Sequence, residues 1–337
     1  MKNLARRRLL QIGYPEPRND DWIYFPTAKL SCFEIPEADG ENETETFPSG
    51  IPEETDFSAL LPLAYAAKTL EKVIPENAEE FGLLKTRDEF AHSVVHVRKN
   101  AKCSLEILQN IQERAYSSER LDFFVEENAE LLLLILDKTP CAELHLKHLK
   151  IHARENARIN IAFLNTAKGL SRTSFEIYLD GKNASANYFA LHFLNGKASA
   201  HTHLKIYQNA ENTKSSQFVR NILDETANAS FDGSVKVKKD ASEVFSSQLV
   251  NTILLSDNAK IFVKPVLEIY HDNVECTHGA TCGSLDREEL FYLESRGLKK
   301  EDARKILICS FIKEVFLDEN LCKFRTRILK ELELLAV

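Results

Sequence analysis

An internal repeat constrains the fold of this 337-residue chain more than any other feature. The dipeptide Asn-Ala recurs every 26 to 28 residues, at Asn100, Asn128, Asn156, Asn183 and Asn209. Asparagine tolerates left-handed and turn conformations, and alanine is small enough for a crowded corner. Each dipeptide is followed by a segment in which apolar and polar residues alternate. Stacked turns at near-constant spacing predict a β-solenoid.

The rest of the repeat region supports parallel coils rather than hairpins. The Asn-Ala pattern continues less regularly at Asn228 and Asn258, and only two Asp-Gly pairs, the usual hairpin signal, occur there. A β-sandwich would show turn signals too, but not one dipeptide at constant period. Eight of the ten prolines precede residue 76, so the region that follows is almost free of them, as a long sheet requires.

Composition excludes several classes of protein. The net charge of −8 argues against nucleic-acid binding, which needs a dense basic surface. No apolar run is long enough to span a membrane, and the N-terminus has no secretory h-region. The seven cysteines are scattered without a C-x-x-C pair, which indicates free thiols in a reducing cytoplasm. Neither a nucleotide-binding loop nor a hydrolase nucleophile motif is present.

Signals at the two ends differ from those of the repeat. Leu60, Leu63 and Ala67 follow helical spacing, and Trp22, in a proline-rich loop, is expected to pack on the core. After Gly283, Asp286 opens a capping-box pattern for a helix. We therefore predict an N-terminal helical and loop region over 1–94, a β-helix over 95–282 and a C-terminal helical domain over 283–337.

Histidines gather in two places within the repeat. His145, His148 and His152 lie in one segment, and His201 and His203 share a face of another. One interpretation is a metal site. The other, favoured because no carboxylate or thiol stands beside them at ligand spacing, is that outward strand positions accept histidine freely.

The junction between the repeat and the C-terminal helices holds a second candidate site. Cys276 and His278 point to the same face if the backbone is extended. A thiolate and an imidazole so placed are ligands for a soft metal or for sulfur. The alternative is a strand end with a buried cysteine and a half-exposed histidine.

The sequence around these residues resembles a known family. Residues 276–298, CTHGATCGSLDREELFYLESRGL, are similar to the junction motif (S/T)-H-G-A-T-x-G-x-(L/I)-(D/E) followed by FYLxSRG of the SufB/SufD family, the scaffold subunits of SUF iron–sulfur cluster assembly. In that family the motif closes a right-handed β-helix and opens a C-terminal helical domain. The SufB branch carries Glu where this chain has Gly279, so the resemblance is to the SufD branch.

The resemblance implies a fold and a function. The fold is mainly β, a right-handed parallel β-helix flanked by N- and C-terminal helical regions. The function is that of a non-catalytic scaffold working with SufB, the ATPase SufC and, indirectly, a cysteine desulfurase system; a homodimer is a further expected assembly of the isolated subunit. A transient iron–sulfur cluster would form at the SufB contact, with His278 as an iron ligand and Cys276 as a nearby thiol.

The C-terminal helices carry more apolar surface than a short helix needs for its own core. One stripe is Leu307, Phe311 and Val315, and the other contains Ile308, Ile312 and Phe316. Together with the resemblance, this pattern predicts a SufC docking surface at Leu307, Phe311, Val315, Ile308 and Ile312. The alternative is that both stripes are buried within the chain.

Two other functions remain open at this point. One is a SufB-like scaffold in a simpler complex, against which Gly279 argues. The other is a β-helical carbohydrate-active enzyme, which needs carboxylates gathered on the outer face of the solenoid. The repeat offers few acidic residues on its strands, and the FYLxSRG run has no place in such an enzyme.

Overall fold

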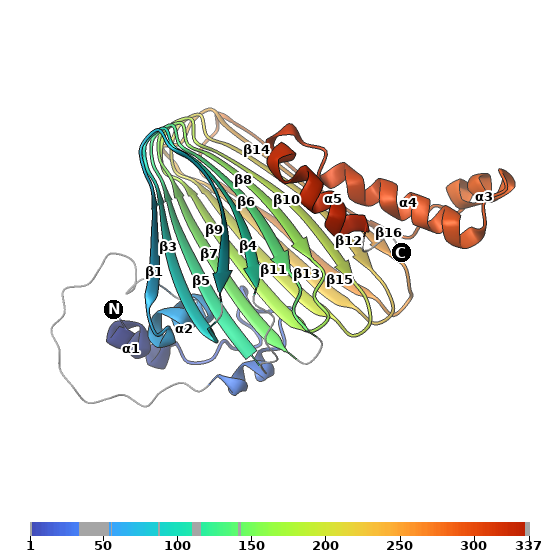
Figure 1. Ribbon diagram of the computed structural model, residues 1–337, viewed down its shortest axis with the longest axis horizontal. Coiled ribbons are helices and arrows are strands. Elements are labelled where there is room, and N and C mark those ends of the chain that lie inside the picture. The colour runs from blue at the N-terminus through green and yellow to red at the C-terminus, as the bar shows by residue number, and fades with distance from the viewer. Residues whose placement is uncertain are drawn as a thin grey trace.

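The computed structural model describes residues 2–33, 54, 56–86, 88–109, 116–140 and 143–333. Within these ranges sixteen strands form two eight-stranded sheets, and consecutive strands alternate between them (Figure 1). Sheet A holds the odd-numbered strands and sheet B the even-numbered ones. Neighbours pair in parallel, as in β9 with β11 and β8 with β10. The predicted parallel β-solenoid is thereby confirmed, while its right-handed sense stays a prediction.

The elements follow one another in the order of the repeat. Sheet A contains β1 (Thr69–Ile74), β3 (Phe90–Val97), β5 (Tyr116–Val125), β7 (Leu144–Ala153), β9 (Leu170–Leu179), β11 (Ser199–Gln208), β13 (Asn228–Val237) and β15 (Lys260–Ile269). Sheet B contains β2 (Glu79–Thr86), β4 (Lys102–Gln109), β6 (Glu130–Asp137), β8 (Arg158–Asn165), β10 (Ser185–Leu194), β12 (Lys214–Leu223), β14 (Val244–Leu254) and β16 (Val274–Gly283). The helices are α1 (Lys2–Ile12), η1 (Thr27–Cys32), α2 (Phe57–Tyr65), α3 (Arg287–Ser295), α4 (Lys300–Val315), η2 (Glu319–Phe324) and α5 (Arg325–Glu333).

Asparagines at the corners from sheet A to sheet B explain the repeat. The corner residue has a positive φ, near 55–60°, at Asn77, Asn100, Asn128, Asn156, Asn183 and Asn212. From Asn100 onward each side chain donates to the asparagine of the preceding coil, at 2.7–3.2 Å, so that a ladder of amides runs along the solenoid. Asparagine accepts the left-handed conformation at lower cost than most residues.

One corner differs from the sequence prediction. Asn209 was expected at the fifth corner, but the left-handed residue there is Asn212, and the Asn209 amide instead donates to Asp180 at 2.6 Å. The dipeptide misled because Asn209 opens this corner, at the position that Asp180 has in the preceding coil, whereas the left-handed residue of both corners is the fourth, Asn183 and Asn212. The sequence reading also missed Asn77, which begins the ladder.

The strands begin earlier than expected. A helical and loop region was predicted over 1–94, yet α2 ends at Tyr65 and β1 starts at Thr69. The strands β1 and β2 are short and largely solvent-exposed at the first coil, so they lack the apolar alternation that marks a buried strand. The division of the chain into three domains stays a prediction.

The core lies between the two sheets. Inward side chains such as Val125, Ile151, Ile161 and Ile177 are fully buried and belong to one continuous apolar cluster. Branched and aromatic side chains suit this position, because they pack well on a pleated surface. Each strand gives the opposite set of side chains to the outer face of its sheet.

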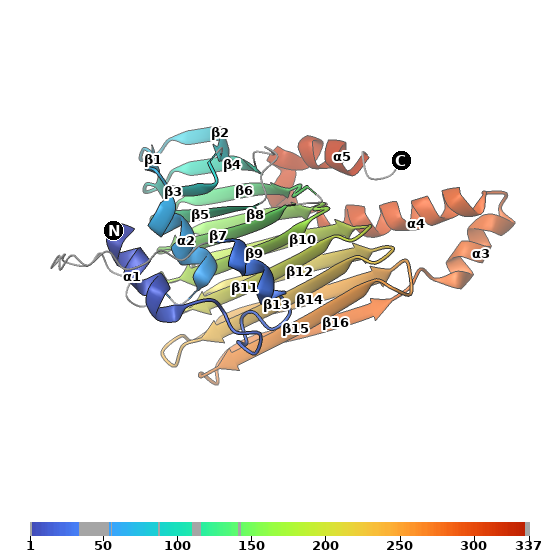
Figure 2. The same cartoon turned by 90° about the horizontal axis from the view of Figure 1, so that it is seen from below.

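Helices cover the outer faces of both sheets (Figure 2). The N-terminal helix α2 packs on β3, β5 and β7 of sheet A, and Trp22 is buried there with Phe57, as expected for an anchoring residue. On the other side, α4 packs on β10 and β12, and η2 on β6 and β8. The solenoid is therefore sandwiched between its own terminal segments.

The capping signals after β16 are confirmed. The Asp286 carboxylate accepts from the backbone N–H groups of Glu288 and Glu289 at the start of α3. Gly297 follows the end of this helix with φ +91°, a conformation that favours glycine. In Figure 1, α3 lies at the far end of α4, away from the sheets. No helix in the described ranges is long and apolar enough to cross a membrane.

Candidate functional site

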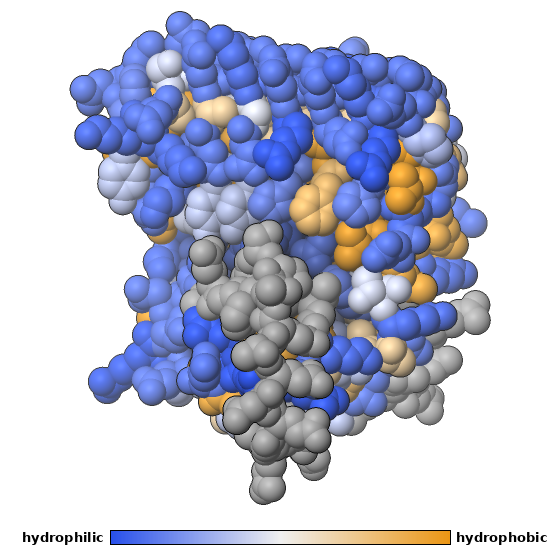
Figure 3. All heavy atoms as spheres, turned by 90° about the vertical axis from the view of Figure 1, so that its left-hand side faces the viewer, coloured by the Kyte–Doolittle hydropathy of each residue, from blue (hydrophilic) through white to orange (hydrophobic). Residues whose placement is uncertain are grey.

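The two ends of the solenoid carry unpaired strand edges. At the first coil, apolar side chains such as Val73 and Phe81 are exposed. Figure 3, which views the left-hand side of Figure 1, shows apolar residues among a mostly hydrophilic surface. At the last coil, among the strands that the structure describes, β15 pairs only with β13 and β16 only with β14. An unpaired edge presents free backbone donors and acceptors, so each end can accept another strand.

The two edges of the last coil differ in what they offer. Strand β15 carries Pro265, which cannot donate to a ladder, together with Lys260 and Lys264, which discourage pairing. Strand β16, with the sequence VECTHGATCG, has no proline and one charged residue. We infer that β16 is the better edge for strand addition.

The junction motif forms β16 itself, and its period sets which residues face inward. Cys276 packs against the core cluster, so His278 and Cys282, at even spacing from it, lie on the same face. Gly279 is on the other face, where an added Cβ would meet the exposed Leu249 side chain at 3.5 Å. The inward residues Cys276, His278 and Cys282, called here the terminal row, have no further coil to cover them.

The geometry brings Cys276 and His278 together as the sequence predicted. Alternate residues of one strand lie about 7 Å apart. Cys276 is half-buried, and His278 is exposed. Burial raises the pKa of the Cys276 thiol, although a hydrogen bond from the Ser246 backbone opposes this, so the thiol stays protonated at neutral pH until a metal or another electrophile takes it.

The terminal row alone does not make a metal centre. Within the described ranges, no group of three or more His, Cys, Asp or Glu side chains is arranged to hold a metal ion. A thiol and an imidazole on one exposed strand leave most of a coordination sphere to be supplied from elsewhere. Chemically, the row can contribute one or two soft ligands to a site that another molecule completes.

Two glutamines beneath His278 were missed in the sequence. In sheet B, Gln217, Gln248 and His278 occupy successive strands in register. Gln248 Nε2 donates to Gln217 Oε1 at 2.6 Å, and both side chains are buried. The 31-residue interval between the glutamines could have been noticed, but it differs from the Asn-Ala period because the intervening corners are longer.

The other histidines have separate environments. His145 lies inside the solenoid beside Glu119, while His148 and His152 face outward from the same strand. His152 contacts Asp180 at 3.0 Å. His201 and His203 share the outer face of β11, as predicted, but their neighbours are serines and Asp21 respectively. The structure gives no support for a metal site in either group.

Inside the solenoid, Glu119, Lys147 and His145 form a buried charged cluster. Lys147 Nζ is 2.8 Å from Glu119 Oε1, and His145 Nε2 is 3.3 Å from the same oxygen. Burial alone would raise the pKa of Glu119, but Lys147 and His145 hold it well below its usual value. Since the carboxylate is paired on both sides, we interpret this cluster as structural.

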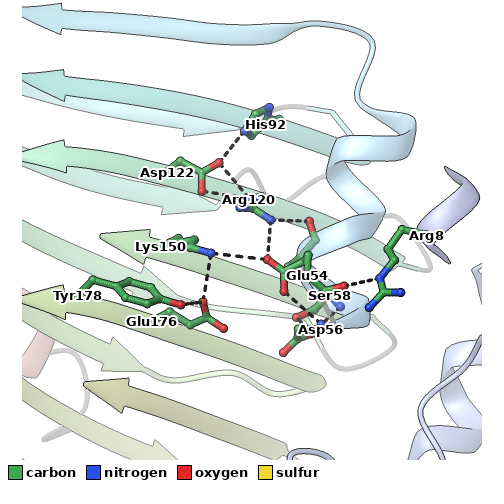
Figure 4. Close-up of polar contacts among 11 residues, drawn as sticks. Arg8, Glu54, Asp56, Ser58, His92, Arg120, Asp122, Lys150, Glu176 and Tyr178 are labelled. Atoms are coloured by element: carbon green, nitrogen blue, oxygen red, sulfur yellow. Dashed lines mark hydrogen bonds and ion pairs between the residues drawn. The ribbon is translucent and has the colours of Figure 1, made fainter. Parts of the chain in front are cut away.

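A second polar network fixes the N-terminal segment to sheet A (Figure 4). Arg120 contacts Glu54 at 3.3 Å and Asp122 at 2.9 Å, and His92 is 2.8 Å from Asp122. Burial would raise the pKa of Asp122, but Arg120 and His92 hold it far below its ordinary value. Lys150 extends the network from Glu54 toward the Glu176–Tyr178 hydrogen bond, as the figure shows. Its charges compensate one another, so it is a docking contact rather than a reactive site.

The predicted docking residues on α4 mostly face the solenoid. Ile312, Val315 and Phe316 are buried against sheet B, and Ile308 and Phe311 pack against the same cluster. Leu307 is half-buried. The exposed apolar side chains of this region are instead Phe291, Tyr292, Leu298, Ile306 and Leu317.

These features define a class: a two-sheet parallel β-solenoid whose last strand presents a Cys-x-His row at an open edge. A family model described as "SUF system FeS cluster assembly, SufBD core domain" matches residues 83–311. The chain therefore belongs to the SufBD family of iron–sulfur cluster assembly proteins. The family match gives no support to the carbohydrate-active alternative.

Several curated proteins are similar to this chain. An iron–sulfur cluster assembly SufBD family protein of Synechocystis is 32% identical over 194 residues, which are 58% of this chain and 43% of the relative. The chloroplastic protein ABCI7 of Arabidopsis thaliana is 30% identical over 58% of this chain and 41% of its own length. The assembly protein SufD of Escherichia coli is 29% identical over 60% and 48% respectively. The chain thus spans about half the length of the curated relatives it matches.

Proposed function

We propose that this protein is a SufD-type scaffold subunit, without catalysis of its own, that helps to build and transfer nascent iron–sulfur clusters. Its partners in this proposal are a SufB-type subunit and the ATPase SufC, with a cysteine desulfurase system as the sulfur source, all in the cytoplasm. The observation that carries the proposal is the terminal row: Cys276 and His278 on the inward face of an unpaired strand. Similarity to proteins named SufD supports it.

The partner would add a strand to the open edge. Strand addition gives affinity through backbone hydrogen bonds and places side chains of both chains on one face. Because β16 is the less protected edge, a SufB strand paired there would bring its own ligands beside His278 and Cys276. The iron and sulfide are cargo, held by residues from both subunits and released to an acceptor.

The two residues would play different parts. His278, exposed and neutral in its metal-binding form, supplies an imidazole to iron. Cys276 is half-buried with a raised pKa, so its thiol is a weaker ligand until the nearby metal favours the thiolate. The terminal row therefore predicts that substitution of His278 reduces cluster formation more than substitution of Cys276 does.

The SufC contact would use the C-terminal helices. Since Ile308, Ile312 and Val315 pack on sheet B, we assign docking to the exposed side of the α3–α4 hairpin, around Phe291, Tyr292 and Ile306. Exposed large apolar side chains on a projecting helix pair are typical of an interface. Movement of α4 driven by the ATPase would be transmitted to sheet B through the buried contacts.

The test is reconstitution with purified SufB and SufC. Cluster absorbance and iron content are measured for His278→Ala, Cys276→Ala and the control Thr277→Ala, whose side chain lies on the opposite face of the same strand. We expect His278→Ala to form the complex but no cluster, Cys276→Ala to reduce the yield, and Thr277→Ala to match the native protein. Full cluster yield from His278→Ala would reject the ligand assignment, and loss of SufB binding would show a structural role instead.

A further inference from the structure

We propose that Gln248 is a positioning residue for His278: its side-chain amide continues a hydrogen-bonded ladder, Gln217–Gln248–His278, that selects one tautomer and one ring orientation of the imidazole. The consequence for iron binding depends on the proposed function. The ladder itself depends only on the chain.

Three residues, Gln217, Gln248 and His278, form one column across neighbouring strands of sheet B. Gln217, Gln248 and His278 are in register on adjacent parallel strands, which are about 4.8 Å apart. At that spacing the first two amides form a 2.6 Å hydrogen bond. The same register makes His278 the next residue of this column, on the strand beside Gln248.

Within the described part of the chain, the Gln217–Gln248 pair leaves one buried acceptor and one buried donor without a hydrogen bond. A primary amide stacked between two neighbours donates on one side and accepts on the other. Gln248 Oε1 is buried and has no partner among the described residues, as has Gln217 Nε2 at the opposite end of the pair. A buried acceptor that makes no hydrogen bond destabilises the folded protein. His278, the next residue in the column, carries a ring N–H that would satisfy it.

The space that the Gln248 amide occupies depends on Gly233. Gly233 lies in sheet A, in the register column of Phe175 and Leu204, where side chains fill the core. A Cβ added at Gly233 would lie 2.1 Å from Gln248 Nε2 and 2.6 Å from the Phe231 ring. A real Cβ does not approach so closely, so the glycine is what allows the Gln248 amide to stay in line with the ladder.

The chemical consequence concerns the second ring nitrogen. When one imidazole nitrogen donates its proton to a fixed oxygen, the other is left as an acceptor, which is the form that binds a metal. Partners of this kind set the orientation of metal-binding histidines, and their loss commonly weakens metal affinity 10- to 100-fold. Gln248 would do this from inside the solenoid, leaving the outward side of the ring for iron.

The test begins with the isolated full-length chain, labelled with ¹⁵N and ¹³C at histidine. The ring shifts of His278 report its tautomer. We expect one tautomer in the native protein, a mixture in Gln248→Met, and a shift in the same direction in Gly233→Ala. Gln248→Glu, which keeps an acceptor oxygen at the same reach, should restore the single tautomer.

The matched control is Gln217→Met. It removes the same kind of amide from an equally buried position one coil further from His278, so a merely structural effect would appear in both variants. We expect Gln217→Met, which keeps the Gln248 carbonyl oxygen, to disturb the tautomer less than Gln248→Met does. A native His278 that already exchanges between both tautomers would overturn the proposal without any variant, as would an unchanged tautomer in folded Gln248→Met.

A second measurement separates this inference from the proposed function. Iron affinity is compared in the reconstituted complex, where Gln248→Met is expected to bind Fe²⁺ at least tenfold more weakly than Gln217→Met. If His278→Ala retains the cluster, the ligand assignment fails but the tautomer result stands. If the tautomer does not respond to Gln248, positioning fails while the ligand assignment is still judged by His278→Ala.

Discussion

The guanidinium of Arg172 lies 3.9 Å from the centre of the Trp22 ring, on the outer face of sheet A. The same guanidinium is 3.6 Å from Asp56, which precedes helix α2. Two separate parts of the N-terminal segment thus meet at one strand residue. The contact explains how a loop with little secondary structure is held in a fixed place over the solenoid.

This contact predicts a strong effect of truncating Trp22. Trp22→Ala removes a side chain that is 2% exposed and leaves a cavity beside Phe57, so it should lower the free energy of unfolding by about 3 kcal/mol. Urea denaturation followed by circular dichroism measures the change. Ile23→Ala, at a 47% exposed neighbour, is the control and should change stability by less than about 0.5 kcal/mol. Equal effects would show that the loop is not anchored through Trp22.

The asparagine ladder predicts different costs for two substitutions at one corner. Asn128→Ala loses two ladder hydrogen bonds and places alanine at φ 58°, so we expect a loss of about 2–4 kcal/mol. Asn128→Gly loses the same hydrogen bonds, but glycine adopts a positive φ without strain. Its loss of stability should therefore be clearly smaller. Chemical denaturation of both variants gives the difference.

Asn258→Ala is the control for the ladder. It removes an exposed asparagine that also precedes an alanine but is absent from the positive-φ corners of the described chain. It should be near neutral. If Asn128→Gly proved as costly as Asn128→Ala, backbone strain would contribute nothing and the ladder bonds would account for the whole effect.

A buried histidine predicts that stability falls in mild acid. Burial lowers the pKa of His192 to about 4, against a smaller opposing effect of Asp137, so the folded protein keeps the ring neutral while the unfolded chain protonates below about pH 6.5. Its contribution is therefore fully present above pH 6.5 and is lost as pH falls toward 4. Between these two pH values, this one group changes the free energy of unfolding by about 1.4 kcal/mol per pH unit.

The pH effect of His192 can be isolated by difference. Burial also lowers the pKa values of His201 and His203 to about 3, so the native protein should lose stability more steeply than one group would cause. The free energy of unfolding of His192→Gln is measured with urea between pH 7 and 5. It should fall less steeply with decreasing pH than that of the native protein, because the contribution of His192 is missing. Identical slopes in both proteins would mean that His192 is also neutral in the unfolded chain at these pH values, or charged in both states.

The C-terminal helices predict a separation between folding and docking. Ile312→Asp places a charge at a 3% exposed position against sheet B, and we expect a loss of more than about 3 kcal/mol and aggregation. Phe291→Ser changes a 72% exposed side chain on α3, and we expect native stability but weaker SufC retention in a pull-down. Retention unchanged in Phe291→Ser, with native stability, would move the SufC contact away from α3.

The same packing predicts the result of deleting the C-terminal region. The deletion of residues 286–337 would remove the cover from Leu134, Leu136 and Leu191 on the outer face of sheet B. Exposure of such a patch favours association, so a soluble truncated solenoid is not expected. Point substitutions therefore test docking more cleanly than truncation does.

Local patterns were sufficient to predict the class of fold. The positive-φ asparagines at 100, 128, 156 and 183 were readable from the sequence, because a left-handed corner favours asparagine whatever surrounds it. The α3 cap at Asp286 and its end at Gly297 were equally readable, since both follow from backbone conformation within one turn. The spacing of Cys276 and His278 on one face also followed from strand period alone.

Tertiary structure decided what depends on which strands become neighbours. The bond from Gln248 to Gln217, the approach of Gly233 to that amide, and the stacking of Arg172 on Trp22 join residues whose spacing along the chain follows no local period. The burial of Ile312 against sheet B was likewise undetermined, because an apolar helix stripe packs equally well on a sheet of its own chain or on a partner. The sequence determined the corners and the terminal row. The register between coils decided which side chains become the neighbours of these residues.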